Sequence, residues 1–410
     1  MKNTQEFIRY ANSFQTVIHL SLQRILALLE YVGNPQDKLQ VIHVAGTNGK
    51  GSVCSFLQSI LTVSGKKTGK YISPNLLRVN ERISVDGTDI SDDDLKRLLH
   101  KIESYVPKVK EKVGEIPSQF EIWTAVAFCY FLEQNCDIVI LETGLGGRFD
   151  ATNVVNRPIA TVITRIAVDH TAYLGDTLSK IAFEKAGIIK SGAPLITLPQ
   201  ETEAMETLAA VANEKHAEII LTKTPAVHLP KGHREVFSYG AFHRIESGLM
   251  GYHQIENACL AIETALTLKL SSQDIIKGIR MAKNPGRLEL LDDRLLFDGA
   301  HNLNGMSALK YNLDRYYPDT PKIFVSAFMR DKDILSSLGV FRGETFCFTT
   351  VKENERAELP ETLCTIGKQA GVYGIAFSDL EGALSYAKDS GRLIVVCGSL
   401  YLYKDLWEIL

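Results

Sequence analysis

The sequence H-V-A-G-T-N-G-K-G-S at residues 43–52 joins an apolar run at residues 41–45 to an amphipathic pattern at residues 52–63. A strand that leads through a glycine-rich loop into a helix is typical of phosphate sites. The glycines let several backbone N–H groups point at one anion beside the positive end of the helix dipole. Lys50 adds a positive charge for the outer phosphates, and the Ser52 hydroxyl is suited to ligate Mg²⁺. The stretch predicts a site for a nucleoside triphosphate.

The loop spacing differs from the G-x-x-x-x-G-K-[ST] pattern, because two residues separate Gly46 from Gly49 and Gly51 follows the lysine. A plain glycine-rich turn is the alternative, but three glycines, a lysine and a hydroxyl between a strand and a helix favour nucleotide binding. No [NT]-K-x-D element follows a strand, which weakens the case for a guanine-specific switch. The predicted nucleotide-binding residues of the loop are Gly46, Thr47, Asn48, Gly49, Lys50, Gly51 and Ser52.

Short β-branched runs alternate with longer helical patterns on both sides of this loop, which is typical of an α/β fold with a mostly parallel sheet. We expect strands at residues 41–45, 138–141, 160–164, 195–197 and 218–221. We expect helices at residues 52–63, 91–105, 120–133, 177–189 and 254–269. Residues 224–250 show weak periodicity and fit either a small antiparallel excursion or a loop.

A second α/β series follows the turn-forming residues 284–286, with strand-like runs at residues 295–298, 323–326, 344–349 and 392–397. A chain of 410 residues favours two domains. We predict an ATP-binding domain at residues 1–288 and a smaller, Rossmann-like C-terminal domain at residues 289–410.

The composition limits the partners of the chain. A formal charge of −3 gives no global field toward nucleic acid or an anionic membrane. Seven scattered cysteines without a C-x-x-C pair argue against a disulfide framework and against a zinc site. The polar N-terminus has no signal-peptide pattern, and no run approaches the roughly 20 apolar residues that span a bilayer. We therefore expect a cytoplasmic protein, monomeric, with small-molecule substrates.

Three further residues stand out, although each has a plain structural interpretation. Glu142 ends a buried strand, His170 follows another, and Lys185 lies in a predicted helix. A carboxylate at the carboxyl end of a parallel strand lies at the edge where ligands bind. Taken singly, Glu142 is equally well a strand-end residue, His170 a packed or solvated histidine, and Lys185 a solvated lysine.

The ordered set of motifs resembles the Mur ligase superfamily and, within it, folylpolyglutamate synthase and dihydrofolate synthase. The resemblance extends over roughly residues 40–402. It rests on G-T-N-G-K-G-S, S-P-N-L-x-x-x-x-E-R-I (residues 73–83), E-T-G-L-G-G-R-F-D-A-T-N (142–153), D-H-T-x-x-L-G (169–175), E-K-A-G-I (184–188), H-Q-x-x-N-A (253–258), P-G-R-x-E (285–289) and D-G-A-H-N (298–302). The chain departs from the family at Asn75, where histidine is usual, and at Thr143, where valine is usual.

The resemblance implies a role for each residue at a motif position. Ser73, Glu142 and His170 would hold one Mg²⁺, and Ser52 would help to hold a second with ATP. Lys185 would be carbamylated by CO₂. Asn257, Arg287 and Asp298 would contact the nucleotide, with His301 near the phosphates. Lys50, His170, Lys185 and His301 are the implied catalytic residues, and Phe120, Glu121, Phe149, Asp150 and Ala151 the implied pterin-site residues.

The implied reaction is ATP-dependent addition of L-glutamate to dihydropteroate and to folate polyglutamates through an acyl phosphate. The alternative is folylpolyglutamate synthase activity alone. A muropeptide ligase would carry a further N-terminal domain, for which the loop at residue 46 leaves no room. The alternative from a different functional class is a nucleotide-binding module that does not catalyse ligation.

Overall fold

The structure is a computed structural model that describes residues 21–410, so the predictions about the N-terminal stretch lie outside the described residues. The chain forms two compact units. The first contains the chain up to His228 together with Phe237–Gly248 and Glu256–Lys283. The second contains Asn284–Leu410 and two short earlier segments, Leu229–Val236 and Leu249–Ile255. The predicted domain boundary at residues 288/289 stays a prediction.

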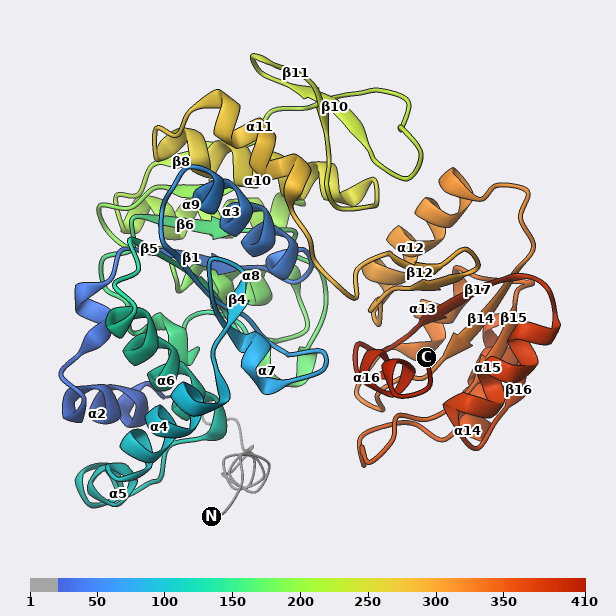
Figure 1. The fold of residues 1–410 in the computed structure, drawn as a ribbon, viewed down its shortest axis with the longest axis horizontal. Helices are drawn as coiled ribbons and strands as arrows, with labels where there is room; N and C mark the ends of the chain where they lie inside the picture. The colour runs from blue at the N-terminus through green and yellow to red at the C-terminus, as the bar shows by residue number, and fades with distance from the viewer. Residues whose placement is uncertain (1–20) are drawn as a thin grey trace. The chain divides into compact units, whose positions relative to one another are not determined.

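The first unit is built on an eight-stranded sheet with the order β4-β3-β2-β5-β1-β6-β7-β8 (Figure 1). Strands β2, β5, β1, β6, β7 and β8 are parallel, and β3 and β4 extend one edge in antiparallel pairing. Their bounds are β1 Val41–Ala45, β2 Thr68–Tyr71, β3 Ile83–Val85, β4 Thr88–Asp89, β5 Ile138–Glu142, β6 Ala160–Ile163, β7 Leu195–Thr197 and β8 Ile219–Leu221. The predicted α/β class with a mostly parallel sheet is confirmed.

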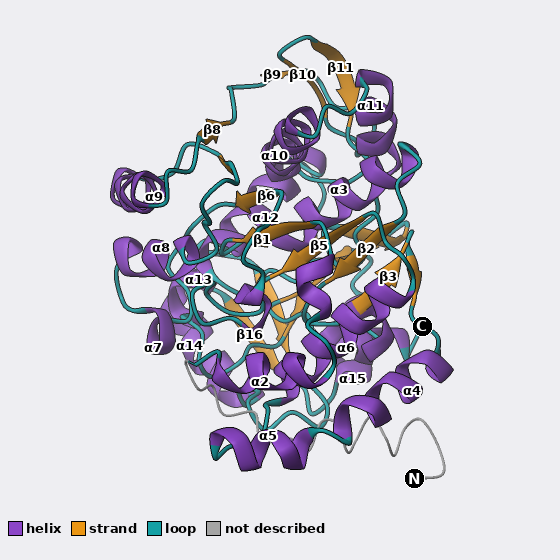
Figure 2. Cartoon of the chain, turned by 90° about the vertical axis from the view of Figure 1, so that its left-hand side faces the viewer, coloured by secondary structure: helices purple, strands orange, loops and turns teal. Residues whose placement is uncertain are grey.

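Helices connect these strands and cover the sheet (Figure 2). Their bounds are α2 Gln23–Tyr31, α3 Lys50–Val63, α4 Asp92–Glu103, α5 Val106–Val113, α6 Gln119–Glu133, α7 Thr171–Leu174, α8 Leu178–Ala186, α9 Thr202–Glu214, α10 His253–Thr267 and α11 Ser272–Met281, with short 3₁₀ turns at η1 Pro35–Lys38, η2 Val79–Arg82 and η3 Ala151–Val154. Each of these predicted helices is present, with ends that differ by at most three residues.

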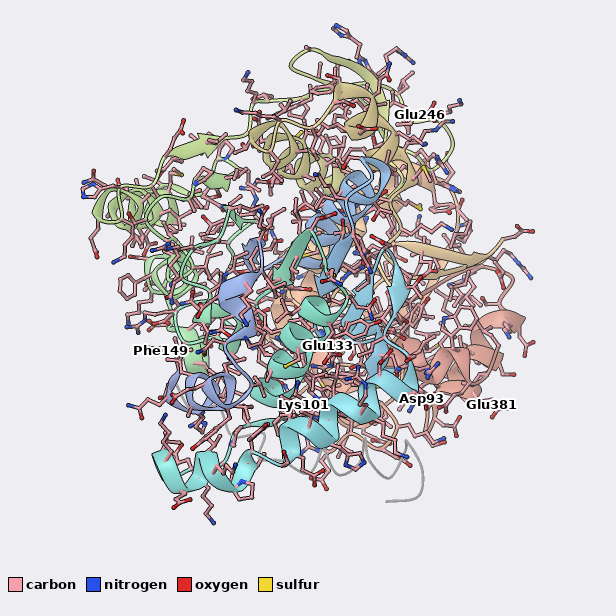
Figure 3. All side chains as sticks on the ribbon, turned by 60° about the vertical axis from the view of Figure 1, so that its left-hand side comes forward. Asp93, Lys101, Glu133, Phe149, Glu246 and Glu381 are labelled. Atoms are coloured by element: carbon pink, nitrogen blue, oxygen red, sulfur yellow. The ribbon has the colours of Figure 1, made fainter. Side chains whose placement is uncertain are left out.

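Local capping explains where two of these helices begin. The Ser91 hydroxyl accepts a hydrogen bond from the Asp94 backbone N–H at 3.1 Å, and three aspartates occupy the first turn of α4. Ser118 caps α6 in the same way. Helices α4 and α6 pack together, and Lys101 of α4 lies 3.9 Å from the carboxylate of Glu133 at the end of α6 (Figure 3).

Residues 224–250 contain a small antiparallel sheet, which is one of the two structures that the sequence predicted for this stretch. Strands β9 Ala226–Val227, β10 Val236–Tyr239 and β11 Phe242–Glu246 make a three-stranded sheet in the order β11-β10-β9. The following helices return to the first unit, where the Ser59 hydroxyl of α3 donates to the carbonyl of Gly278 in α11 at 2.7 Å.

The second unit is a six-stranded sheet with the order β12-β13-β17-β14-β15-β16, parallel except for β12. An aromatic cluster fills its core, in which Phe324 and Phe346 stack with ring centroids 4.7 Å apart. Its elements are β12 Glu289–Asp292, β13 Leu295–Phe297, α12 Leu303–Tyr316, β14 Lys322–Ser326, α13 Ile334–Gly339, β15 Thr345–Phe348, α14 Pro360–Ala370, β16 Tyr373–Ala376, α15 Leu380–Asp389, β17 Leu393–Cys397 and α16 Leu402–Trp407.

The topology of the first sheet places three chain segments at one edge. Strand β1 lies between β5 and β6, with Val44 opposite Glu142 and Ala45 opposite Ile163. Because these three strands are parallel, the segments that follow them emerge at the same carboxyl edge, where open α/β sheets bind ligands. Within residues 21–410, no helix has the length and apolar content that crossing a membrane requires.

Candidate active site

The phosphate loop turns sharply between β1 and α3, and two glycines make this turn possible. Gly46 and Gly49 have φ angles of 146° and 92°. A Cβ atom on Gly46 would lie 1.8 Å from the hydroxyl oxygen of Thr164, and one on Gly49 would lie 2.3 Å from the side-chain oxygen of Asn257. Both positions therefore require glycine on grounds of conformation and of space.

The chain segment after β6 supports the loop. The backbone N–H groups of Thr47 and Asn48 donate to the carbonyl of Arg165 at 2.9 and 3.3 Å, and the Thr164 hydroxyl donates to the carbonyl of Asn48 at 2.7 Å. Thr164 is not among the predicted site residues. It ends the predicted strand at residues 160–164, and that position is the sequence signal that could have pointed to it.

Lys50 and Asn257, two of the predicted nucleotide-binding residues, lie at the loop. The Lys50 ammonium donates to the carbonyls of Gly46 and Thr47 at 3.2 and 3.4 Å. Asn257 is 6% exposed and lies in α10. A flexible lysine that rests on its own loop is free to extend toward a phosphate, and the Asn257 amide lies against the tightest part of the turn.

Glu142 brings a buried carboxylate to the beginning of α3. It ends β5, is 5% exposed, and its Oε2 atom lies 3.7 Å from the position that a Cβ atom of Gly51 would occupy. The next residue, Ser52, is 4% exposed. Oxygen donors of this kind fit Mg²⁺, which prefers carboxylate and hydroxyl oxygens beside substrate phosphates.

Ser73 and His170, the other predicted Mg²⁺ ligands, lie in two loops of the same unit. Ser73 precedes Pro74 in a cis peptide bond, and the Glu81 carboxylate accepts hydrogen bonds from the backbone of residues 76–78 in that loop. His170 begins α7 with a φ angle of 52°, and its side chain is 38% exposed. Residues 21–410 contain no group of three or more His, Cys, Asp or Glu side chains arranged to hold a metal ion. The set that joins Ser73, Glu142 and His170 stays a prediction.

Lys185 is buried directly beside the phosphate loop. It is 4% exposed, and its Nζ atom donates to the carbonyl of Gly46 at 2.8 Å. Burial and, less strongly, the nearby Lys50 lower the pKa of Lys185 to about 7, while Asp169 and Asp150 oppose the shift. The amine is therefore neutral in a large fraction of molecules near neutral pH, which is the state in which an amine acts as a nucleophile.

Two of the predicted pterin-site residues meet at Gly144, in the loop that follows Glu142. The Phe120 ring packs against Gly144, whose Cβ atom would lie 2.7 Å from the ring. Asp150 accepts hydrogen bonds from the N–H groups of Gly144 and Leu145, both at 2.9 Å. Burial raises the pKa of Asp150, and these hydrogen bonds oppose the rise. Ala151, another of the predicted pterin-site residues, directly follows Asp150 and is 5% exposed.

Phe149 and Glu121 have partners that the sequence did not predict. The guanidinium carbon of Arg148 lies 4.4 Å from the Phe149 ring centroid, in cation–π contact; Figure 3 labels this ring. The Glu121 carboxylate accepts from the Ser118 N–H at 2.6 Å and from Arg24 Nε at 3.0 Å. Glu121 therefore closes a capping box and a buried ion pair, and its contact with a pterin stays a prediction.

The second unit carries the predicted residues Arg287, Asp298 and His301 in two segments, one before β12 and one after β13, that meet where the Gly299 N–H donates to the carbonyl of Gly286 at 3.1 Å. Asp298 is 7% exposed and accepts hydrogen bonds from the N–H groups of Leu288 and Ala300 at 2.7 and 2.8 Å. Burial raises the pKa of Asp298, and the charge of Arg287 opposes that rise. Because a carbonyl only accepts, the 2.8 Å contact between His301 Nδ1 and the oxygen of Gly299 places a proton on Nδ1.

Comparisons with known proteins identify the family and the fold of the chain. Residues 44–265 match the family model of the Mur ligase middle domain. The dihydrofolate synthase/folylpolyglutamate synthase of Bacillus subtilis is 35% identical over 409 residues, which cover 94% of each chain. A structure of Mycobacterium tuberculosis folylpolyglutamate synthase complexed with ADP and AMPPCP superposes with a TM-score of 0.89 at 29% identity, covering 99% of this chain and 98% of that one. E. coli FolC in complex with DHPP and ADP gives a TM-score of 0.88 at 29% identity, covering 99% and 97%.

The phosphate loop on a parallel sheet, followed by a second α/β unit, together with these matches defines an ATP-dependent ligase of the Mur ligase type. Within that class, the chain belongs to the dihydrofolate synthase/folylpolyglutamate synthase family. The family resemblance stated from the motifs is confirmed.

Proposed function

We propose that this chain adds L-glutamate to dihydropteroate and to folates that already carry glutamate, through an acyl phosphate. The observation that carries the proposal is the arrangement around one phosphate loop, in which the Lys185 amine lies at Gly46 and the Glu142 carboxylate lies by Gly51. The names of relatives that span almost the whole chain support the choice of substrates.

In the proposed reaction, the backbone N–H groups of the loop and the beginning of α3 receive the phosphates of ATP. An oxygen of the substrate carboxylate attacks the γ-phosphorus, and ADP leaves. The amine of L-glutamate then attacks the acyl carbon and loses a proton, and the tetrahedral intermediate expels phosphate. Lys50 neutralises charge that develops on the transferred phosphoryl group. Catalysis is thus mainly positioning and charge stabilisation.

Ser52, Ser73, Glu142 and His170 would hold two Mg²⁺ ions, which neutralise charge on the phosphates. The buried Glu142 carboxylate at the beginning of α3 supports this assignment. Asn257, Arg287, Asp298 and His301 would contact ATP or the acyl phosphate. An arginine suits such a contact because its planar fork pairs with two oxygens and stays charged.

Lys185 would carry a carbamate. Its neutral Nζ attacks the carbon of CO₂, the displaced N–H proton passes to solvent, and the product is an anion. The lowered pKa and the burial of Lys185 support the step. The anion would reverse the charge at this position and offer oxygen atoms for metal or phosphate-site contacts.

The pterin would bind near the loop after Glu142, beside Phe120, Glu121, Phe149, Asp150 and Ala151. The meeting of Phe120 and Asp150 at Gly144 supports this location. Cytoplasmic location and a monomeric state belong to the same proposal.

An ADP-release assay tests the proposal with dihydropteroate and with tetrahydrofolate, each with and without L-glutamate. We expect glutamate-dependent ADP release with both acceptors. Release with tetrahydrofolate alone would restrict the chain to folate extension. ATP binding without glutamate-dependent release would favour a nucleotide-binding module and overturn the proposal.

A further inference from the structure

Helix α12 of the second unit is held against two segments that occur much earlier in the chain. The helix begins directly after the D-G-A-H-N turn, where the Asn302 side chain accepts a hydrogen bond from the Gly305 N–H at 2.8 Å. Near its other end, three side chains, Asn312, Arg315 and Tyr316, contact residues of Leu229–Val236 and Leu249–Ile255. No role in ATP binding has been assigned above to these three residues.

The first contact is a buried ion pair. Glu235 is fully buried, and Arg315 donates to its two oxygens from Nε and Nη2 at 2.7 and 2.9 Å. The hydroxyl of Tyr316 donates to the same carboxylate at 2.6 Å. A bidentate arginine and a hydroxyl satisfy the buried charge and fix the orientation of all three side chains.

The second contact holds three consecutive residues. The Tyr316 hydroxyl accepts from the Gly251 N–H at 3.2 Å, and Asn312 Oδ1 accepts from the Tyr252 N–H at 2.6 Å. The Asn312 amide nitrogen then donates to the carbonyl of Ala308 at 2.7 Å and to His253 Nδ1 at 3.2 Å.

His253 contacts the amide groups of two side chains. Its Nδ1 atom lies 3.2 Å from the Asn312 amide nitrogen, and its Nε2 atom lies 3.1 Å from the Gln254 amide nitrogen. Burial lowers the pKa of His253 to about 4, in agreement with a neutral ring. Asn312, Tyr316 and His253 therefore form one ordered network around the backbone of residues 251–253.

This backbone leads directly to the phosphate loop. His253 is the first residue of α10, and the chain passes from the second unit to the first between Ile255 and Glu256. Asn257, in the same turn of helix, lies against Gly49. The first residue of α10 therefore has a partner on α12, and Asn257 follows four residues later in the same helix.

We infer that Tyr316 and Asn312 are positioning residues for ATP, because they hold residues 251–253 and thereby the first turn of the helix that carries Asn257. The inference rests on the proposed function through the assignment of Asn257 to the nucleotide.

The chain offers a matched pair of variants for the test. Tyr316→Phe removes a hydroxyl with two partners and keeps the ring. Tyr317→Phe removes the neighbouring hydroxyl, which is buried and has no hydrogen-bond partner among the described residues. We would measure the dissociation constant of AMPPCP with Mg²⁺ by calorimetry, together with the KM values for ATP and L-glutamate and the melting temperature.

For Tyr316→Phe we expect AMPPCP affinity to fall and the KM for ATP to rise by about fivefold, the factor that one ordinary hydrogen bond is worth, with the KM for L-glutamate unchanged. Tyr317→Phe should bind like the wild type. A lower melting temperature with unchanged AMPPCP affinity would reduce Tyr316 to a structural residue and overturn the inference. Equal losses in both variants would also overturn it. Because AMPPCP binding requires no turnover, the absence of glutamate-dependent ADP release would count against the proposed function alone.

Discussion

The ammonium nitrogen of Lys185 lies 2.8 Å from the carbonyl oxygen of Gly46, so a buried lysine of α8 is hydrogen-bonded to the first glycine of the phosphate loop. The position gives the lysine two properties that a solvated helix residue lacks. Burial lowers its pKa toward neutrality, and the loop keeps the amine beside the expected phosphates. The predictions about Lys185 follow from this contact.

Replacing Lys185 by alanine should reduce kcat for glutamate-dependent ADP release by about a hundredfold, the loss typical of one preorganised electrostatic group. If the functional form is a carbamate, a small carboxylate such as formate should enter the space and restore part of the rate. Lys190→Ala is the matched control, because Lys190 is a half-buried lysine whose pKa is also lowered, and its ammonium donates to the carbonyl of Gly187. A rate for Lys185→Ala within a few-fold of the wild type would contradict the assignment.

Lys185 should also make stability depend on pH. Its pKa is about 7 in the folded protein against an ordinary value of 10.5. Below the folded pKa the lysine is charged in both states, and the cost of burying that charge is fully present. Between these two pKa values the unfolded chain binds more protons, so the contribution of Lys185 to the free energy of unfolding rises with pH.

Lys185→Met keeps the volume of the side chain and does not titrate. Urea unfolding in CO₂-free buffer, at about pH 6 and about pH 9, should show the variant more stable relative to the wild type at the lower pH than at the higher. The difference between the two proteins isolates this group from other groups that titrate in the same range. A stability difference that is the same at both pH values would exclude a depressed lysine pKa.

Gly49→Ala should weaken ATP binding by more than the loss of fold stability alone would cause. Gly49 and Gly33 have similar positive φ angles, 92° and 85°, so alanine at either costs about 1–2 kcal/mol of backbone strain. Only at Gly49 would the new Cβ atom meet the Asn257 oxygen, whereas nothing lies within 4 Å at Gly33. We expect the KM for ATP to rise about tenfold in Gly49→Ala, a loss of about 1.4 kcal/mol. Gly33→Ala should lower only the melting temperature, and an equal rise in KM there would contradict the account.

Two buried threonines should respond to valine in opposite directions. Thr143 is 1% exposed, and its hydroxyl has no partner within residues 21–410. The Thr152 hydroxyl is bonded to His43 Nε2 at 2.7 Å and to Asp150. Thr143→Val should therefore raise the free energy of unfolding by about 1 kcal/mol, and Thr152→Val should lower it by about 1–3 kcal/mol. Chemical denaturation measures both. Destabilisation by Thr143→Val would show that its hydroxyl is satisfied.

The features that sequence could predict are those set by local pattern. The phosphate loop, the strand that ends at Glu142 and the beginnings of α4 and α6 follow from glycines, apolar periodicity and the capping serines 91 and 118. Strand β2 was not predicted, because Thr68–Tyr71 contains Gly69 and Lys70 and becomes a strand only by pairing with β3 and β5.

The remaining features depend on partners that are distant in sequence. The Glu121 carboxylate bonds Arg24, which lies 97 residues away. Thr164 supports a loop 116 residues earlier, and Asn312 holds a backbone 60 residues before it. No spacing or composition marks such pairs, since only the packing of the elements brings them together. The lowered pKa of Lys185 has the same origin, because it follows from burial that only the folded chain provides.

The most direct test of the central claim is glutamate-dependent ADP release from wild-type protein with dihydropteroate as the acceptor, followed by mass spectrometry of the product. The account predicts stoichiometric ADP and a product heavier by one glutamate, and the same result with tetrahydrofolate. ADP release that does not depend on glutamate, or no release with either acceptor in protein that binds ATP, would contradict it.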